Sequence, residues 1–427
     1  TVLRNDYNQG YGGNQKIGYA YASANNYDYV ALIHGDGQYA PEELGNLLQP
    51  LLDDEADAVF GSRMMQKGRA LQGGMPVYKY AGNRILTKIQ NTLLRRDLSE
   101  YHSGYRVYRV SALEEIHYRL NANGFHFDTQ IILQLLNNGS RIVELPIPTY
   151  YGDEVSRVNG IKYAWNVVVN TAANFLHGLG LWQQRRLDPA VQKASPYRSK
   201  LDFTSPHSLA VDAVAPGSRV IDLGAGPGDV AGALVRRGCE VTVVDMVEPE
   251  VETGPIEVMV QDLNDPIAFD VSDKNAILML DVIEHLVDPE DFLDRLRSQF
   301  DHAPKTLVLS TPNIAFAVQR LSLLFGQFNY GRTGILDRTH TRLFTFRTLK
   351  HLLRDAGFNI RVIRGVPAPF PLVAGKRLGG LLLRLNELLI RLSKTLFSFQ
   401  IFVVAESTPD VNFLVTNARD SHHFNEA

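Results

Sequence analysis

The sequence predicts an α/β protein with two folded domains, and three observations support this. The chain has 427 residues, and that length favours two to three domains that each bury a core. In both halves, apolar runs of strand length alternate with helical segments. A polar, proline-bearing stretch at residues 183–206 separates the halves and is typical of a linker. With 45% hydrophobic and 21% charged residues, most of the chain should fold.

The amino-terminal half contains two short apolar strands, two helices and a later extended segment. We place strands at 29–33 and 56–60, helices at 41–52 and 79–94, and a proline-marked strand at 141–151. Residues 8–18 form a glycine-rich loop that runs into a helix, with no strand before it. Such loops normally follow a strand, and the chain begins at Thr1 without a methionine. We therefore expect a fragment that lacks its amino-terminal part.

The carboxyl-terminal half contains five apolar runs of strand length. They lie at 219–223, 240–245, 256–260, 276–280 and 306–310, and helical segments separate them. This alternation predicts a parallel sheet covered by helices on both faces. Residues 314–325 form an apolar helix, and a basic amphipathic helix is expected at 379–397.

Charge and cysteine content exclude several classes of protein. Lysine and arginine number 43 against 46 acidic residues, so no global positive field favours a nucleic-acid partner. The single cysteine, Cys239, forms no internal disulfide and belongs to no zinc-binding cluster. The sequence shows no signal peptide and no apolar run of about eighteen residues. We expect a cytoplasmic protein.

A glycine-rich turn in the second half has the form of a nucleoside-binding motif. Residues 220–228 lead a strand into glycines, which let a ligand approach the backbone closely, and then into a helix. Asp245 ends the next strand about twenty residues later, where a carboxylate can accept both hydroxyls of a ribose. Asp262 follows the third strand, where it could accept the amino group of an adenine or stand as a solvated loop residue.

These features occur in an order that resembles the class I S-adenosylmethionine-dependent methyltransferases. The segments VIDLGAGPG, VVD, QDLN, LDVIEHLVDPEDFL and LSTPN carry the resemblance, which covers residues 205–407 and leaves a tail at 408–427. It implies a Rossmann-like parallel sheet and S-adenosylmethionine as the cofactor. The methionine end of the cofactor would contact Asp222, Gly224, Gly226 and Gly228. Asp245 would bind the ribose and Asp262 the adenine, and residues from Asp281 to His285 would lie beneath the sulfonium.

Two histidines are candidates for a general base, because methyl transfer to a hydroxyl requires removal of a proton. His285 follows the fourth strand, and His340 lies in the long connection after the fifth. Alternatively, His285 caps its helix and His340 makes a structural hydrogen bond. The connection at 314–345 could be a lid over a hydrophobic substrate or part of the core. The helix at 379–397 could lie on a membrane, although packing against the domain is the commoner role.

The first half carries a second motif at the end of its first strand. In the segment HGDGQ, Asp36 is placed to hold Mg²⁺ or Mn²⁺ against a diphosphate. With GSR at 61–63 and SGYR at 103–106, it resembles the inverting GT-A glycosyltransferases of the dolichyl-phosphate mannose synthase type. The resemblance runs over residues 5–151 with a continuation to 182, so it implies a partial GT-A domain at 1–182 and a linker at 183–204.

The resemblance assigns roles to five residues of this half. Asp36 corresponds to the second acid of the metal motif, and Gln38 to the glutamine that follows it. Arg63 and Arg106 would face the donor diphosphate and the acceptor phosphate. His34 stands where the family usually has an acid, and an imidazole suits Mn²⁺ better than Mg²⁺.

The sequence therefore predicts a bifunctional glycosyltransferase and S-adenosylmethionine-dependent methyltransferase that acts on glycan or glycolipid substrates, with methylation on oxygen. The expected partners are a nucleotide-sugar donor, a glycan or polyprenyl-phosphate acceptor, and the inner face of a membrane. The uncharged helix at 163–184 could lie at a lipid interface or bridge the two domains. One alternative is a methyltransferase whose first half only docks a glycan or lipid. Another is a scaffold with two inactive sites.

Overall fold

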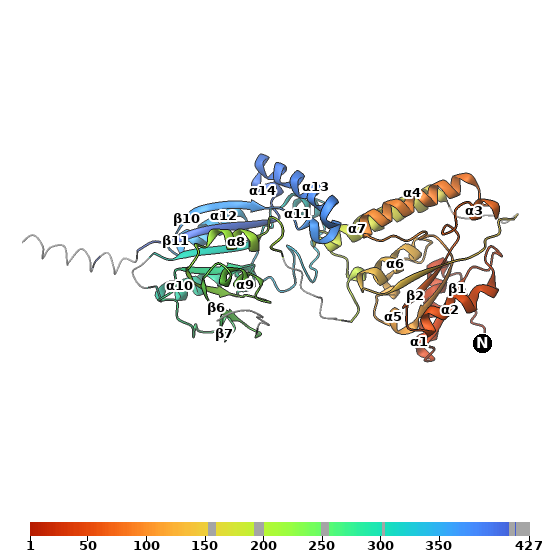
Figure 1. The fold of residues 1–427 in the computed structure, drawn as a ribbon, viewed down its shortest axis with the longest axis horizontal. Helices are drawn as coiled ribbons and strands as arrows, with labels where there is room; N and C mark the ends of the chain where they lie inside the picture. The colour runs from red at the N-terminus through yellow and green to blue at the C-terminus, as the bar shows by residue number, and fades with distance from the viewer. Residues whose placement is uncertain (153–158, 192–199, 249–255, 301–303, 410–414, 416–427) are drawn as a thin grey trace, which may run out of the picture. The chain divides into compact units, whose positions relative to one another are not determined.

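The computed structural model describes residues 1–152, 159–191, 200–248, 256–300, 304–409 and 415, which form two compact units (Figure 1). The first unit contains Thr1–Gly178 and Trp182–Ser195, and the second contains Leu179–Leu181 and Pro196–Ala427. Part of the predicted linker, 192–199, and nearly all of the predicted tail lie outside the described residues.

The first unit is built on a mixed sheet of four strands. Its order is β1 (Tyr29–Ile33), β3 (Tyr105–Arg109), β2 (Ala58–Ser62) and β4 (Ile142–Pro146). Strand β3 runs antiparallel to both neighbours, whereas β2 and β4 are parallel. Alternate residues of a strand point to opposite faces, so Phe60 packs in one apolar cluster with Tyr108, and Val59 in another with Val107.

The helices of the first unit cover both faces of this sheet. They are α1 (Gly10–Ala24), α2 (Leu44–Leu52), α3 (Arg69–Gln72), α4 (Val77–Leu94), α5 (Val110–Glu114), α6 (Phe127–Asn137) and α7 (Gly160–Gly178), with 3₁₀ turns at Pro41–Glu43, Tyr118–Leu120 and Arg185–Leu187. The first of them corrects the expected loop at 8–18, because the helix already begins at Gly10. There the backbone takes a φ of 77°, which glycine adopts without strain.

Helix α7 carries asparagines at positions 166, 170 and 174, spaced along one side of the helix, and two of them pack inside the first unit. Asn170 accepts a hydrogen bond from Gln130 of α6 at 3.0 Å, and Asn174 accepts one from Asn137 at 2.8 Å. Both asparagines are buried, whereas Ile161 and Trp165 on the same helix are exposed. These two asparagines therefore form polar contacts between two helices and do not face a lipid surface.

The second unit contains a sheet of seven strands. In spatial order they are β10 (Phe358–Val366), β11 (Gln400–Ser407), β9 (Thr306–Pro312), β8 (Ala276–Leu280), β5 (Arg219–Leu223), β6 (Glu240–Asp245) and β7 (Ile256–Val260). The five predicted strands are present and parallel. Strands β10 and β11 were not predicted, and β11 runs antiparallel between β9 and β10.

Helices lie on both faces of this sheet, which confirms the predicted architecture. They are α8 (Pro206–Ala213), α9 (Asp229–Val235), α10 (Pro289–Ser298), α11 (Ala317–Leu324), α12 (Phe346–Asp355), α13 (Phe370–Leu392) and α14 (Lys394–Phe397), with the 3₁₀ turn η4 (Ile283–His285). Ile221 packs with residues of α10 and α12, whereas its neighbour Val220 packs with residues of α8 and α9. The two core layers therefore lie on opposite faces of the strands.

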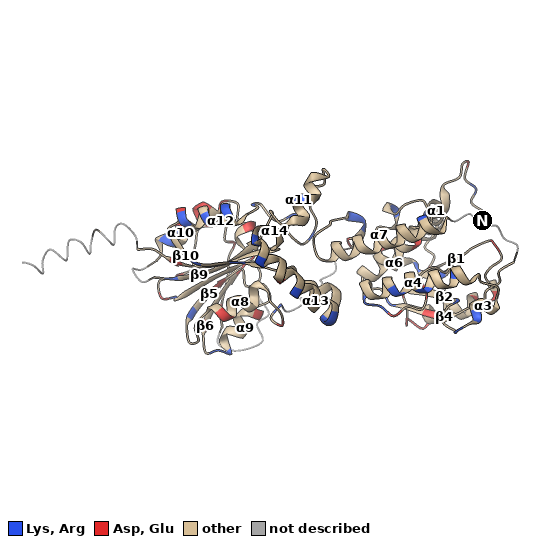
Figure 2. Ribbon diagram, turned by 90° about the horizontal axis from the view of Figure 1, so that it is seen from above, with Lys and Arg blue, Asp and Glu red and all other residues tan. Residues whose placement is uncertain are grey.

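The predicted helix at 379–397 is a longer helix with an exposed apolar side. Helix α13 is kinked at Gly375, and the expected span is divided at Ser393. Leu381, Leu385, Leu388 and Leu392, spaced as one helical face, are between 52% and 76% exposed. Figure 2 shows the positions of basic residues, in blue, along the ribbon of the same helix.

Candidate active sites

The predicted cofactor residues gather at one edge of the seven-stranded sheet. From β5 the chain proceeds outward through β6 to β7 and then returns to β8 on the other side of β5. In open α/β sheets, ligands bind at the carboxyl ends of the strands where the order reverses in this way. The turn after β5, Asp245 at the end of β6, Asp262 after β7 and Asp281 after β8 all lie at these ends.

The glycine turn after β5 requires glycine for two reasons. Gly224, Gly226 and Gly228 have φ values of 74°, 55° and 83°, a region that disfavours other residues. A Cβ at Gly224 would also collide with Val282. The amide of Gly226 donates a hydrogen bond of 2.8 Å to Oδ2 of Asp245, so the turn is tied to the end of the next strand.

Two of the predicted cofactor carboxylates interact with each other. Asp222 is 2% exposed, and burial, together with the charge of Asp245, raises its pKa to about 7. Asp245 is partly exposed, and its Oδ1 accepts a hydrogen bond from the amide of Val247 at 3.2 Å. The readily protonated carboxyl of Asp222 therefore lies beside the carboxylate of Asp245, which backbone amides orient.

Asp262 and Asp281 are each held in a defined position. Oδ1 of Asp262 accepts from the amide and the side chain of Asn264 at 2.9 and 3.0 Å, which makes a tight local turn. Asp281 has a φ of 57°, unusual for a residue with a side chain. It accepts hydrogen bonds of 2.7 Å from Ser310 and from Gln400 of β11.

The two predicted bases lie side by side in the structure. The rings of His285 and His340 have centroids 4.8 Å apart and are nearly perpendicular. Nδ1 of His285 lies 3.2 Å from the carbonyl oxygen of Thr339, and Nδ1 of His340 lies 2.9 Å from that of Ile335. If each Nδ1 carries the proton, each Nε2 has a free lone pair. Burial lowers the pKa of His340, which favours its neutral form.

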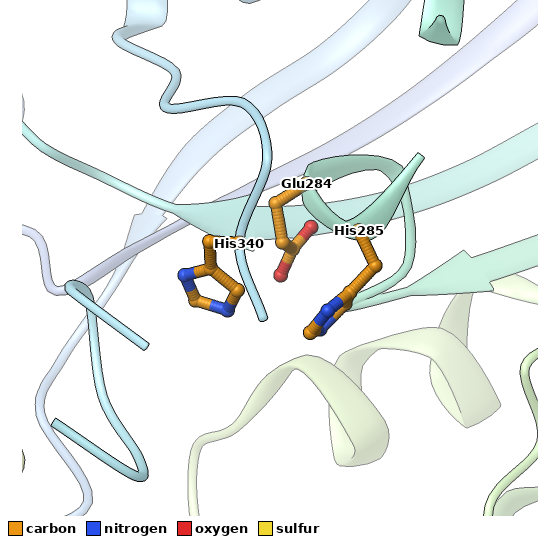
Figure 3. Close-up of side chains that lie close together, drawn as sticks. All are labelled: Glu284, His285 and His340. Carbon is orange, nitrogen blue, oxygen red and sulfur yellow. The ribbon is translucent and has the colours of Figure 1, made fainter. Parts of the chain in front are cut away.

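Sequence reasoning did not single out the acid between these histidines. Glu284 is 1% exposed, and in the described part of the chain its carboxylate oxygens have no hydrogen-bond partner. Burial, followed by the charge of Asp281, raises the pKa of Glu284 well above its usual range. Figure 3 shows its carboxylate between the two imidazole rings. The only signal in the sequence was the Glu-His pair directly after a buried strand.

In the first unit, the metal-motif residues follow β1. Nε2 of His34 lies 2.6 Å from the hydroxyl of Tyr11, which itself donates to Asp128 at 2.7 Å. Nδ1 of His34 is 4.0 Å from the exposed carboxylate of Asp36. The Asp36 carboxylate also accepts from the amide of Gln38 at 3.1 Å. His34 and Asp36 are therefore adjacent, and Gln38 closes the turn through its backbone.

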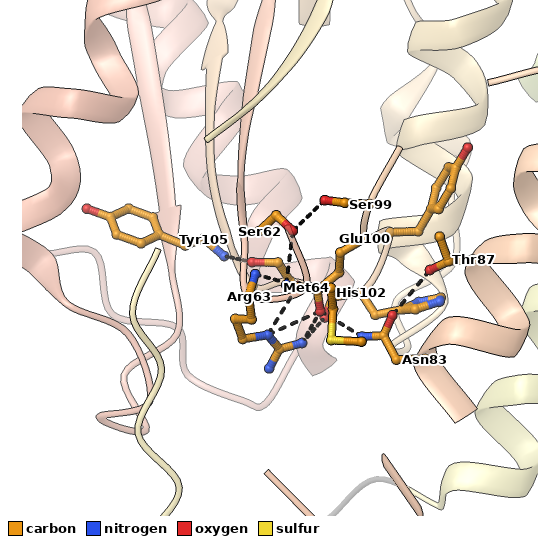
Figure 4. A network of polar contacts seen from close by, with 12 residues as sticks. Ser62, Arg63, Met64, Asn83, Thr87, Ser99, Glu100, His102 and Tyr105 are labelled. Atoms are coloured by element: carbon orange, nitrogen blue, oxygen red, sulfur yellow. Dashed lines mark hydrogen bonds and ion pairs between the residues drawn. The ribbon is translucent and has the colours of Figure 1, made fainter. Parts of the chain in front are cut away.

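Both predicted phosphate-binding arginines are engaged by protein groups. Arg63 is ion-paired with the buried Glu100 (Figure 4). Its Nη1 also donates to the Tyr151 hydroxyl at 3.1 Å. Arg106 is 1% exposed, lies 3.4 Å from Asp128 and donates to the Tyr101 carbonyl at 3.0 Å. Neither Glu100 nor Tyr151 was selected from the sequence, because nothing in the local pattern relates them to Arg63.

Comparison with protein-family models confirms both resemblances. A model described as a methyltransferase domain matches residues 181–362. A model described as glycosyl transferase family 2 matches residues 1–117. The chain therefore contains a methyltransferase domain and a family 2 glycosyltransferase domain.

Curated relatives match one half of the chain each. A low-salt glycan biosynthesis hexosyltransferase of Haloferax volcanii is 35% identical over 30% of this chain and 30% of its own. A UDP-N-acetylglucosamine–dolichyl-phosphate N-acetylglucosaminyltransferase of Methanococcus voltae is 29% identical over 35% of this chain and 59% of its own. The chain thus spans less than two thirds of either relative. A ubiquinone biosynthesis O-methyltransferase of Xylella fastidiosa is 29% identical over 44% of this chain and 76% of its own.

Solved structures also match the chain in part. The 1,6-didemethyltoxoflavin-N1-methyltransferase of Burkholderia thailandensis, solved with S-adenosylhomocysteine, is 17% identical with a TM-score of 0.32. The match covers 48% of this chain and 76% of that one. Separately, none of the helices in the described part of the chain is long and apolar enough to cross a membrane.

Proposed function

We propose that this chain, which joins a family 2 glycosyltransferase domain to a methyltransferase domain, methylates an oxygen of a glycan or glycolipid with S-adenosylmethionine. One observation carries this proposal. The glycine turn after β5 is hydrogen-bonded to Asp245 at the point where the strand order reverses, and this gives a nucleoside a close backbone approach beside an oriented carboxylate.

The proposed cofactor contacts follow from the chemistry of each group. Asp245 would accept the ribose hydroxyls, and the backbone of the turn from Gly224 to Gly228 would let the methionine part approach closely. Asp262 would accept the adenine amino group. The cofactor would supply an electrophilic methyl group on a sulfonium sulfur. The chain has to orient the acceptor oxygen and provide for the loss of its proton, and His285 and His340 are proposed for that role.

Cofactor titration of one variant tests this assignment. In Asp245→Asn, the charge-assisted hydrogen bonds to the ribose are lost, and we expect affinity for S-adenosylmethionine to fall by about 1–3 kcal/mol. Calorimetric titration of the full chain measures this loss. Asp273→Asn is the matched control, because Asp273 is an exposed acid that pairs with Arg219. Equal affinities for the wild type and Asp245→Asn would refute the placement of the nucleoside.

For the first unit we propose transfer of a sugar from a nucleotide-sugar to a polyprenyl-phosphate or glycan acceptor. The dolichyl-phosphate transferase among the relatives supports that acceptor class. Asp36 and Nδ1 of His34 are close enough for both to bind one Mn²⁺ ion after a small side-chain adjustment, and an imidazole–carboxylate pair suits this ion. The ion would neutralise charge on the donor diphosphate.

A docking module without catalysis is the second candidate for this unit. Arg63 pairs with Glu100, and Arg106 pairs with Asp128. Both guanidinium groups therefore already have protein partners, which favours docking over binding of a substrate phosphate. Incubation with several nucleotide-sugars, Mn²⁺ and polyprenyl phosphate distinguishes the two. Release of nucleoside diphosphate that depends on the acceptor supports transfer, whereas binding of the acceptor without turnover supports docking.

We also propose that the second unit lies on an anionic membrane surface through α13. The four exposed leucines of this helix form its apolar side, and Lys376, Arg377, Arg384 and Arg391 provide positive charge. An amphipathic helix with basic flanks binds such surfaces through buried apolar area and charge attraction. This location would bring the methyltransferase site to lipid-linked acceptors.

A further inference from the structure

The side chains of Glu284, His285 and His340 form a cluster that the proposed function does not fully explain. Their ligand atoms all lie within 4.8 Å of one another. Glu284 and His285 belong to η4, which begins three residues after the end of β8, whereas His340 comes from the connection between α11 and α12. Figure 3 shows the three groups around a common point.

The backbone holds the two segments of this cluster together. The carbonyl oxygen of Glu284 accepts hydrogen bonds from the amides of Thr341 and Arg342 at 2.8 and 3.1 Å. The hydroxyl of Thr341 also donates to the carbonyl of Leu286. His340 is therefore anchored beside η4 by contacts on the residues that follow it.

Both imidazoles are arranged as metal ligands commonly are. In metal sites, a ligating histidine usually donates its second ring nitrogen to a carbonyl or carboxylate, which fixes the ring and leaves the other nitrogen for the ion. Here the Nδ1 atoms of His285 and His340 lie 3.2 and 2.9 Å from backbone carbonyl oxygens. Their Nε2 atoms are then free to coordinate.

The unpartnered carboxylate of Glu284 is the independent indication of a ligand. A buried carboxylate is costly unless a cation or hydrogen-bond donors satisfy it. Glu284 is 1% exposed, and among the described residues neither of its carboxylate oxygens has a hydrogen-bond partner. A cation between Glu284 and the two imidazoles would satisfy both oxygens.

We propose that Glu284, His285 and His340 bind a divalent first-row transition-metal ion, such as Zn²⁺ or Mn²⁺. Two imidazoles and one carboxylate suit these ions, and three protein ligands leave at least one position open. Bond lengths of about 2.0–2.2 Å imply ligand separations of roughly 3–3.5 Å, so the side chains would close by about 1 Å on binding.

The ion would serve the methyl transfer proposed above, and this part rests on that function. An acceptor hydroxyl on the open position has a lowered pKa, and its proton leaves to solvent water. The oxygen then bonds to the methyl carbon while the sulfonium sulfur keeps the electrons of the broken carbon–sulfur bond. His285 and His340 would then act as ligands instead of taking the proton themselves.

Cobalt titration of the full chain tests the metal site without any turnover. Co²⁺ added to chelator-treated protein should produce visible d–d absorption that saturates. We expect Glu284→Gln, His285→Gln and His340→Gln each to weaken the binding responsible for these bands by at least about tenfold. His351→Gln is the matched control, because His351 is exposed on α12 outside the cluster. It should titrate like the wild type.

Calorimetric titration with S-adenosylmethionine separates this proposal from the proposed function. Cofactor binding is measured on the wild type, and cooperative urea unfolding of the three variants shows that they fold. If the wild type binds cofactor but shows no saturable cobalt bands, or if the variants keep them, the metal site is refuted and the methyltransferase stands. If cobalt binds as expected but the cofactor does not bind at all, the proposed function fails and the metal site stands.

Discussion

Burial of Asp222 beside Asp245 makes the stability of the second unit depend on pH. The pKa of Asp222 is raised to about 7 in the folded state, so its folded form holds a proton that the unfolded chain releases at lower pH. This group therefore contributes stability below the unfolded pKa, and that contribution is lost as the pH rises through the folded pKa.

Replacement of the Asp222 carboxyl by an amide should remove its contribution to the pH dependence. From pH 5 to pH 8 we expect the wild type to lose about 3 kcal/mol more unfolding free energy than Asp222→Asn, because the variant has no proton to release. Urea unfolding of both proteins at the two pH values measures the difference. A gap between them that stays constant with pH would contradict the assignment.

At the level of single residues, the sequence predicted the functional groups better than their surroundings. Asp245 and the turn glycines could be selected because strand ends and positive φ leave local signals. Glu284 could not, because its burial depends on the loop that carries His340, more than fifty residues away. Arg106 had a motif but also a buried partner, Asp128, that no local pattern indicates.

The exposed side of α13 makes a membrane-binding prediction for a single element. A charge at Leu388, which is 56% exposed, would have to enter the apolar layer of a bilayer. We expect Leu388→Asp to reduce co-sedimentation with vesicles that contain phosphatidylserine by several-fold.

The control for this experiment carries the same substitution on another helix. Leu52 ends α2 and is 54% exposed, so Leu52→Asp adds the same charge at a similarly exposed site of the first unit. It should co-sediment like the wild type. Equal loss in both variants, or no binding by the wild type, would argue against α13 as the contact.

Strand β8 was predicted from its continuous apolar run, whereas strands β3 and β10, which carry arginines, were not predicted. The run AILML of β8 is buried at every position, as expected for the centre of a parallel sheet. Strand β3 was missed because its sequence, YRVYR, has arginines and tyrosines where a core strand usually has aliphatic residues. Strand β10 lies at the edge of its sheet, and its three polar or charged residues are exposed to solvent.

The division of the whole molecule into two compact units predicts two separable unfolding transitions. A ligand stabilises only the unit that binds it, by about 2.7 kcal/mol at a concentration one hundred times its Kd. S-adenosylhomocysteine should therefore raise the melting temperature of one transition and leave the other unchanged.

Scanning calorimetry with and without this ligand measures the effect, and Asp245→Asn identifies the transition that belongs to the second unit. In that variant, the same ligand concentration should produce a smaller shift. A single transition that moves as a whole would show that the two units unfold together.

At the scale of the whole chain, the order of the two domains was easier to predict than the full set of strands in each. The glycine turn and the metal motif each mark one α/β unit, so two units follow from two motifs. Strands β10 and β11 lie beyond the last recognised motif, and antiparallel insertion of β11 depends on pairing that adjacent residues do not indicate.

Strand β11 pairs with its neighbours in the sheet, and it also orients Asp281 through hydrogen bonds from Gln400. Gln400 is the first residue of β11, yet it orients a side chain that lies 119 positions earlier. A chain that ends before Gln400 would keep every residue proposed to bind the nucleoside and would lose the hydrogen bonds that position Asp281. We therefore expect this truncation to abolish the proposed methylation, although the shortened chain keeps every recognised motif.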